Sequence, residues 1–284
     1  MEQTFYSQLD ALYAQGKVDE AEDFLTSLLD VARAADNQED QITVLNELMG
    51  FYREQGNFSL CLHYCGEVLD IAESLHMEGT LPYATILLNV ANAYRVMEKL
   101  NEAEVYFLEV QQIYSRHLMK DDYRVASLCN NLALVYRAQG EYEMAVRYLE
   151  QALRIIEKIP EAFIEAASTY TNLADIMYET GDTKQASEYL ERAVKIYQTN
   201  NATSDLHYAA ALSALAHSCF NSGDYPQALE NYREAAGTIE KSTGKTRNYA
   251  VMYKNIAATF EKMGQQAEAA LALSEAEEAL KALA

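Results

Sequence analysis

Glycine and proline are scarce in this chain of 284 residues, which contains 11 and 3 of them, and tryptophan is absent. A sheet protein of this length needs many tight turns rich in glycine and proline, so their scarcity argues for long helices joined by short connections. Half of the residues are apolar, which excludes a mostly disordered chain. We therefore expect an all-α fold.

Positive charge is also in short supply. Lysine and arginine number 22 against 43 aspartate and glutamate residues, which gives a formal net charge of −21 at pH 7. Such a surface repels phosphate backbones and anionic headgroups, so we expect neither nucleic acid nor a membrane as a partner. No apolar run approaches the roughly 20 residues of a spanning helix. The N-terminus lacks a basic segment followed by an apolar run, so we predict a cytoplasmic protein.

Groupings of catalytic or metal-binding residues are missing as well. The five histidines are scattered without a Ser-His-Asp or Glu-x-x-His grouping, and glycine patterns that cradle phosphate are absent. Cys61 and Cys65 have the spacing of a metal-binding pair, but no second pair of ligands accompanies them. We predict no enzyme activity, no metal and no cofactor. The four cysteines, at 61, 65, 129 and 219, are expected to be buried, reduced thiols.

What the chain does contain is one pattern that occurs seven times. The template is NLALVYRAQGEYEMA at residues 131–145, where Gly140 marks a turn between two helices. The other turns follow at intervals of 40 to 42 residues, at Gly16, Gly56, Glu98, Gly181, Gly223 and Gly264. The pattern predicts a single domain, 1–284, of seven helix pairs, with approximate repeats 3–38, 39–80, 81–121, 122–160, 161–203, 204–245 and 246–284.

Small and large apolar residues alternate around each turn. A small residue stands five positions after it, at Ala21, Cys61, Ala103, Ala145, Ala186, Ala228 and Ala269. Nine positions after it stands a residue expected to fill the core, at Leu25, Cys65, Phe107, Leu149, Leu190, Tyr232 and Leu273. Offsets of this kind make one face of each helix a packing stripe.

This pattern resembles the tetratricopeptide repeat (TPR). The units exceed the usual ~34 residues, and the run Asn-Leu-Ala-x-x-Tyr-x-x-x-Gly-x-Tyr-x-x-Ala looks most like the TPR domains of kinesin light chains and of Pins-type polarity adaptors. Glu98 departs from the pattern at a turn glycine, and Thr183 and Gln266 depart at aromatic positions. The resemblance implies a right-handed α-solenoid whose first helices line a concave groove for extended peptides or partner helices.

Asparagine recurs on the expected groove face. Nine residues before the turn stand Glu47, Asn89, Asn131, Asn172, Ala214 and Asn255. An amide can both donate to and accept from a ligand's main chain. In the kinesin light chain family, asparagines in this context contact the cargo peptide, and the resemblance extends this role to Asn89, Asn131 and Asn172. The alternative is that these amides satisfy backbone or neighbouring-helix groups.

Arginine recurs three residues before the turn in three consecutive units, at Arg53, Arg95 and Arg137. Guanidinium groups match carboxylates and phosphates, so this column suggests an acidic or phosphorylated peptide, or a C-terminal carboxylate, as the ligand. Further polar contacts are expected from Asn46, Asn92, Asn130 and Asp175. The alternative is that each arginine pairs with an acidic neighbour such as Glu54 or Glu98.

The function expected from these features is a non-catalytic scaffold that binds a protein or peptide ligand. The alternative is a peptide-sensing regulator that resembles the pheromone receptors of bacterial quorum sensing, in which TPR-like repeats bind a short signal peptide. Those receptors carry an effector domain, and a first repeat that begins at about Gln3 leaves no room for one ahead of it. The identity of the partner and the oligomeric state stay open.

Overall fold

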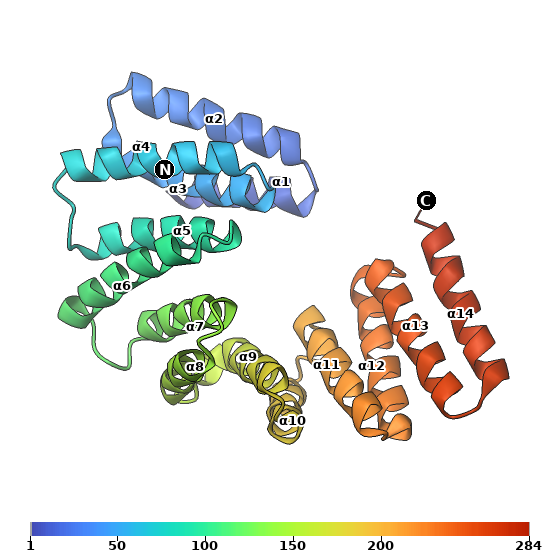
Figure 1. Ribbon diagram of the computed structural model, residues 1–284. Helices are drawn as coiled ribbons and strands as arrows, with labels where there is room; N and C mark the ends of the chain where they lie inside the picture. The colour runs from blue at the N-terminus through green and yellow to red at the C-terminus, as the bar shows by residue number, and fades with distance from the viewer. Residues whose placement is uncertain (1, 284) are drawn as a thin grey trace. The chain divides into compact units, whose positions relative to one another are not determined.

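The computed structural model describes residues 2–283, with side chains described from residue 5 onward. This part of the chain forms fourteen α-helices and no strand, which confirms the predicted all-α fold (Figure 1). The helices are α1 (Glu2–Ala14), α2 (Val18–Ala34), α3 (Gln38–Glu54), α4 (Phe58–Ser74), α5 (Leu81–Val96), α6 (Leu100–His117), α7 (Tyr123–Ala138), α8 (Tyr142–Ile156), α9 (Phe163–Thr180), α10 (Thr183–Thr199), α11 (Leu206–Ser222), α12 (Tyr225–Thr243), α13 (Arg247–Lys262) and α14 (Gln266–Lys281). A single 3₁₀ turn, η1 (Pro160–Ala162), precedes α9.

The helices are grouped in two compact units. The first, Met1–Gln139, holds α1 to α7, and the second, Gly140–Ala284, holds α8 to α14. Consecutive helices pack on one another in each: α3 on α4 and α5 on α6 in the first, α9 on α10, α11 on α12 and α13 on α14 in the second. The single domain predicted from the repeats stays a prediction, and its two end residues lie outside the described part of the chain.

Side chains at the helix starts explain several of the boundaries. Seven helices begin with a residue whose side chain accepts a hydrogen bond from a backbone N–H of the first turn: Asn37, Asn57, Thr80, Asp122, Asp182, Asp205 and Asp224. These bonds satisfy donors that have no partner inside the helix. Pro82 and Pro226 lie in the first turns of α5 and α12, where a missing N–H costs little.

The turn positions found by alignment share one backbone conformation. All seven have a positive φ, from 58° at Glu98 to 88° at Gly181. At six of them, all except Gly140, the backbone N–H of the next residue donates to a carbonyl five residues back, as Asp182 does to Met177 at 2.8 Å. This geometry closes a helix and suits glycine, because a Cβ atom makes the left-handed region unfavourable. Glu98 adopts it without being glycine.

Exchanging residues at two of these turns tests the cost of that conformation. Glu98→Gly should raise the free energy of unfolding by about 1 kcal/mol, because it removes a Cβ from a left-handed residue. Gly56→Ala should lower it by about 1 kcal/mol. A Cβ at Gly56 would meet no atom within 4 Å, so the loss would come from the backbone alone. Urea titrations measure both, and equal stabilities in all three proteins would contradict the argument.

The core is built on the small residues that follow each turn. Ala103, Ala145 and Ala186 are fully buried, as are the other residues at this register. Large side chains nine positions after the turn fill the space beside them, with one exception. Leu273, predicted to be a core residue, is 40% exposed. α14 packs mainly on α13, and its buried residues are Ala269, Ala272, Ala276 and Ala279.

Hydrogen bonds from tyrosines add polar links between helices. Tyr52 of α3 donates to Glu22 of α2 at 2.7 Å, and Tyr136 of α7 donates to Glu104 of α6 at 2.9 Å. In the second unit Tyr208 and Tyr249 bond Glu234 and Glu275 in the same way. Each pair satisfies the hydroxyl of a largely buried tyrosine with a carboxylate from an adjacent helix.

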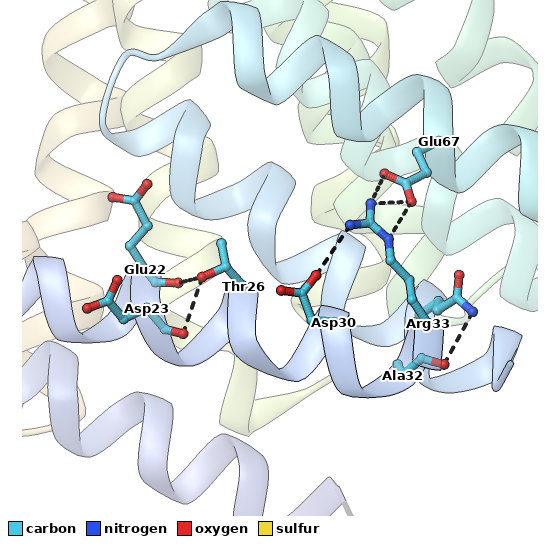
Figure 2. Close-up of polar contacts among 8 residues, drawn as sticks. Glu22, Asp23, Thr26, Asp30, Ala32, Arg33 and Glu67 are labelled. Atoms are coloured by element: carbon cyan, nitrogen blue, oxygen red, sulfur yellow. Dashed lines mark hydrogen bonds and ion pairs between the residues drawn. The ribbon is translucent and has the colours of Figure 1, made fainter. Parts of the chain in front are cut away.

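An ion pair joins α2 to α4. The guanidinium of Arg33 meets the two carboxylate oxygens of Glu67 at 2.6 and 2.7 Å, and Asp30 lies 3.7 Å away on the other side (Figure 2). The hydrogen bonds to Glu67 raise the pKa of Arg33. The arginine side chain is 42% exposed. We therefore expect this ion pair to contribute less to the free energy of unfolding than the buried alanine contacts do.

The start of α7 offers a pH-dependent test of a helix cap. Asp122 accepts from the backbone N–H of Arg124 at 2.9 Å and from its guanidinium, and these bonds lower the pKa of Asp122 to about 2. In the unfolded chain an aspartate titrates near ~3.9. The stabilisation is therefore complete above about pH 4 and is lost as the pH falls toward about 2.

Asp122→Ala should accordingly cost about 1 kcal/mol near neutral pH, and its deficit relative to wild type should shrink below about pH 4. Urea titrations at several pH values measure the difference. The neighbouring, exposed Asp121 provides the control. Asp121→Ala should show no such pH-dependent difference, and a deficit for Asp122→Ala that stays constant with pH would rule out the charged cap.

Candidate peptide-binding face

Most of the residues predicted to bind a peptide lie on three helices of the first unit. α3 contacts α5, and α5 contacts α7, so the first helices of three successive repeats are neighbours. The three helices carry Asn46 and Arg53 on α3, Asn89, Asn92 and Arg95 on α5, and Asn130, Asn131 and Arg137 on α7. All eight are partly accessible. Asn172 and Asp175, also partly accessible, lie on α9 of the second unit.

Two of the asparagines form a hydrogen bond with each other. The side-chain amide of Asn89 donates to the amide oxygen of Asn46 at 2.9 Å, and Asn46 donates to the carbonyl of Ile42 at 3.0 Å. The amides of α3 and α5 therefore form a short chain between the two helices. On α7, Asn131 donates to the carbonyl of Ser127 at 3.2 Å, within its own helix. Each of these amides therefore uses part of its hydrogen-bonding capacity within the protein.

Arg95 is the most unusual cation of this face. Its Nε and Nη2 both lie 3.4 Å from the amide oxygen of Asn92, and its side chain is half-buried. No carboxylate lies within ion-pair distance of it in the part of the chain that the structure describes. Burial, followed by the positive charge of Arg53, lowers the pKa of Arg95. A guanidinium has five N–H donors, and two long bonds to one amide leave most of them for a ligand.

Arg53 does have an acidic neighbour, as one of the two interpretations of the sequence expected. Its guanidinium lies 3.9 Å from the carboxylate of Glu54, whose side chain is 70% exposed. A long ion pair in contact with water contributes little. Arg95, in contrast, does not pair with Glu98. Arg137, Asn130 and Asp175 each take part in an interaction of their own.

Negative charge gathers beside this face as well, which the sequence alone did not indicate. Burial and the negative charges of Asp10 and Glu54 raise the pKa of Glu47, which lies on α3. Burial and the charges of Glu47, Glu54 and Asp10 likewise raise the pKa of Tyr13 on α1. Acidic groups of α1 and α3 therefore lie close to one another, and Arg53 of α3 lies close enough to Arg95 of α5 to lower its pKa.

Three of the four cysteines are buried as predicted, at Cys61, Cys65 and Cys129. A hydrogen bond shared with Cys61, followed by burial, raises the pKa of Cys65, so it stays a thiol. The prediction is wrong for Cys219, which is only half-buried. It stands four residues before the turn, a register at which Leu12, Tyr94 and Met177 are also half-buried while Tyr52, Tyr136 and Phe260 are buried.

Thiol labelling of the native protein should therefore be selective. We expect a thiol reagent to modify Cys219 first, slowed by a pKa that burial raises, while the other three thiols react only after denaturation. Cys219→Ser should abolish the labelling of the native protein, and Cys61→Ser should leave it unchanged. Counting modified residues by mass spectrometry checks this, and native labelling of all four would contradict the burial of the other three.

Two further findings concern the described residues as a whole. They contain no group of three or more His, Cys, Asp or Glu side chains placed to hold a metal ion. Among their helices, none is both long and apolar enough to cross a membrane.

The sequence profile of the tetratricopeptide repeat matches residues 123–199 and 207–282, and a second profile of the same repeat matches residues 84–122. The first profile alone spans more than half of the chain. The chain belongs to the tetratricopeptide repeat family. The predicted solenoid of TPR helix pairs is thereby confirmed.

Curated relatives support the likeness to kinesin light chains. The chain is 20% identical to kinesin light chain-related protein 3 of Arabidopsis thaliana over 84% of its own length and 37% of that protein. It is 31% identical to response regulator aspartate phosphatase E of Bacillus subtilis, over 38% of its own length and 28% of that protein. The chain thus spans about a third of the length of the curated relatives that it matches.

Solved structures show the same fold. BtubC (BKLC) from P. vanneervenii superposes with a TM-score of 0.63 at 16% identity, over 87% of this chain and 92% of that one. The apo form of RapI superposes with a TM-score of 0.76 at 12% identity, over 98% of this chain and 76% of that one. At these identities the likeness establishes the fold.

Proposed function

We propose that this TPR chain is a non-catalytic scaffold whose first-helix face binds an extended, acidic segment of a partner protein. The observation that carries the proposal is Arg95. Its guanidinium is half-buried, lacks a carboxylate partner among the described residues and lies near a second cation, in a chain with a net charge of −21. An arginine that served only the fold would gain by pairing with one of the abundant acidic residues.

A ligand carboxylate between α3 and α5 would give the guanidinium of Arg95 an anionic partner and would offset its repulsion from Arg53. Arg53 and Arg95 would then share one anionic group, and charge-assisted bonds to a guanidinium are short and strong because the group is planar and carries several donors. Glu54 lies 3.9 Å from Arg53 on α3, whereas Arg95 on α5 has no carboxylate within ion-pair distance among the described residues. We infer that the bound segment places its acidic residue over α5 rather than over α1.

The asparagines would hold the main chain of the same segment. Asn46 and Asn89 already orient each other, which leaves the oxygen of Asn89 as an acceptor for a peptide N–H. The proposed site keeps the residues predicted on α3, α5 and α7: Asn46, Arg53, Asn89, Asn92, Arg95, Asn130, Asn131 and Arg137. Asn172 and Asp175, on α9 of the second unit, are proposed as peptide-binding residues of that unit. The proposal includes a cytoplasmic location, which the four free thiols suit.

Charge-removing variants test this site with a synthetic peptide of glutamate and glycine as the probe. Arg95→Ala should weaken binding about tenfold and flatten its dependence on salt, because one charged contact is lost. Asn131→Ala should weaken binding with little change in salt dependence. Titrations at two ionic strengths measure both effects.

Arg116→Ala is the matched control, because it removes the same charge from an exposed position on α6, a second helix. It should change the affinity only slightly. If Arg95→Ala and Arg116→Ala bind the peptide equally well while both remain folded, the acidic-segment function is wrong, and Arg95 is a structural residue.

A second candidate is the peptide-sensing regulator considered from the sequence. It is favoured by the likeness to RapI across 98% of this chain and by the 31% identity to response regulator aspartate phosphatase E. A sensor must bind its ligand with different affinity in two conformations, whereas a scaffold need not. Hydrogen exchange with and without the bound peptide distinguishes them, since only the sensor changes protection far from the site.

A further inference from the structure

A groove lies in the second unit between α11 and α13, the first helices of two successive repeats. Both helices pack on α12, which contributes Tyr232 and Ile239 to the wall of the groove (Figure 1). The groove has a volume of about 480 Å³ and follows α11 from Leu206 to His217. At 1.5 Å per residue this stretch of helix is about 16 Å long, which is the span of roughly five residues of extended chain.

The wall of the groove is mainly apolar. The described residues that line it include no aspartate, glutamate, lysine or arginine, although the whole chain has a net charge of −21. Leu206 and Val251 are each 46% exposed, and the buried side chains of Ile239 and Met252 complete the apolar lining. Apolar side chains would gain from contact with this wall, whereas a charged group would lose its hydration without gaining an ion pair. The groove therefore favours a neutral, apolar ligand.

One polar group of the wall, the side-chain amide of Asn255, has no hydrogen-bond partner in the described part of the chain. Asn255 on α13 stands nine residues before its turn, as Asn89 does on α5. Ser213 on α11 stands ten residues before its turn, as Asn46 does on α3. In the first unit a hydrogen bond of 2.9 Å joins the two side chains at these registers, but Ser213 and Asn255 form no such bond.

The half-buried amide of Asn255 is thus left to a ligand. Such an amide can donate to a carbonyl and accept from an N–H at once, which matches the two polar atoms of a peptide group. The groove combines this amide with an apolar wall that is long enough for several residues. A peptide main chain with apolar side chains has both features, whereas a compact apolar molecule has neither the length nor the peptide group.

We propose that this groove binds an extended segment of a partner protein, about five residues long, that carries uncharged aliphatic side chains such as leucine. A peptide group of the segment bonds the amide of Asn255, and the aliphatic side chains lie against Leu206 and Val251. Alternate residues of an extended chain point to the same side, so leucines two positions apart reach the wall together. This site is independent of the acidic-segment function, because it lies in the other unit and takes a ligand without charge.

Binding of a neutral peptide, Gly-Leu-Gly-Leu-Gly with blocked ends, to the whole chain tests the proposal. The matched control has glutamate in place of both leucines. In ¹⁵N spectra we expect saturable shifts along α11 and α13 with the leucine peptide, and none there with the glutamate peptide. Isoamyl alcohol, which has the branched chain of leucine but no peptide group, should bind at least tenfold more weakly than the leucine peptide.

Two variants separate the apolar contact from the bond to the main chain. Val251→Ser should weaken binding of the leucine peptide about fivefold, whereas Leu271→Ser, which changes an exposed apolar residue on α14 outside the groove, should leave it unchanged. Asn255→Ala should also weaken binding about fivefold. In a set of leucine peptides with an ester in place of one N–H each, one should bind wild type more weakly, and Asn255→Ala should remove that difference.

Several results would overturn the assignment. These are equal shifts along α11 and α13 with the glutamate peptide, binding of isoamyl alcohol as tight as that of the leucine peptide, the absence of saturable binding, or wild-type affinity in both Val251→Ser and Asn255→Ala. None of them bears on the acidic-segment site, for which the glutamate peptide reports through residues of α3 and α5.

Discussion

Close contact between helices at small side chains is the constraint on which the rest of this structure depends. Five residues after each turn stands an alanine or cysteine with almost no exposure, and Ala103, Ala145 and Ala186 are fully buried. Such contacts let two backbones approach while large residues at other registers fill the space around them. Within each of the two units, consecutive helices then pack on one another, as expected for a solenoid. The partly accessible face of the first helices, which carries the candidate residues, follows from this arrangement.

Periodicity was sufficient to predict the helices and the turns. The repeat pattern predicted every turn, including the one at Glu98, and all seven residues have a left-handed backbone. The reason is physical: a repeat encodes backbone register, and backbone register decides which positions face a neighbour. The exception at Leu273 has the same origin. The register is that of a core residue, but α14 lacks the additional packing that would cover it.

Interactions between particular side chains could not be predicted in this way. The arginines at 53 and 95 are equivalent in the repeat, yet one lies near a glutamate and the other bonds an asparagine. The bond between Asn46 and Asn89 and the unpaired hydroxyl of Tyr178 depend on rotamers and on neighbours from other repeats. A repeat pattern shows only what equivalent positions share and does not show the neighbours that are particular to each of them. A tyrosine at position 178 gives no signal in the sequence that its hydroxyl will be buried without a hydrogen-bond partner among the described residues.

The packing of α14 has a consequence for how the second unit opens. Leu271 is 73% exposed, and the buried side of this helix consists mainly of alanines that contact α13. Alanine buries little apolar area, so α14 is held less firmly than a helix such as α12, which packs on both α11 and α13. Proteins open in cooperative segments, beginning with those that have the fewest buried contacts. The amide hydrogens of α14 should therefore exchange with solvent before those of α12, through a local separation from α13 that leaves the alanine contacts of the earlier helices intact.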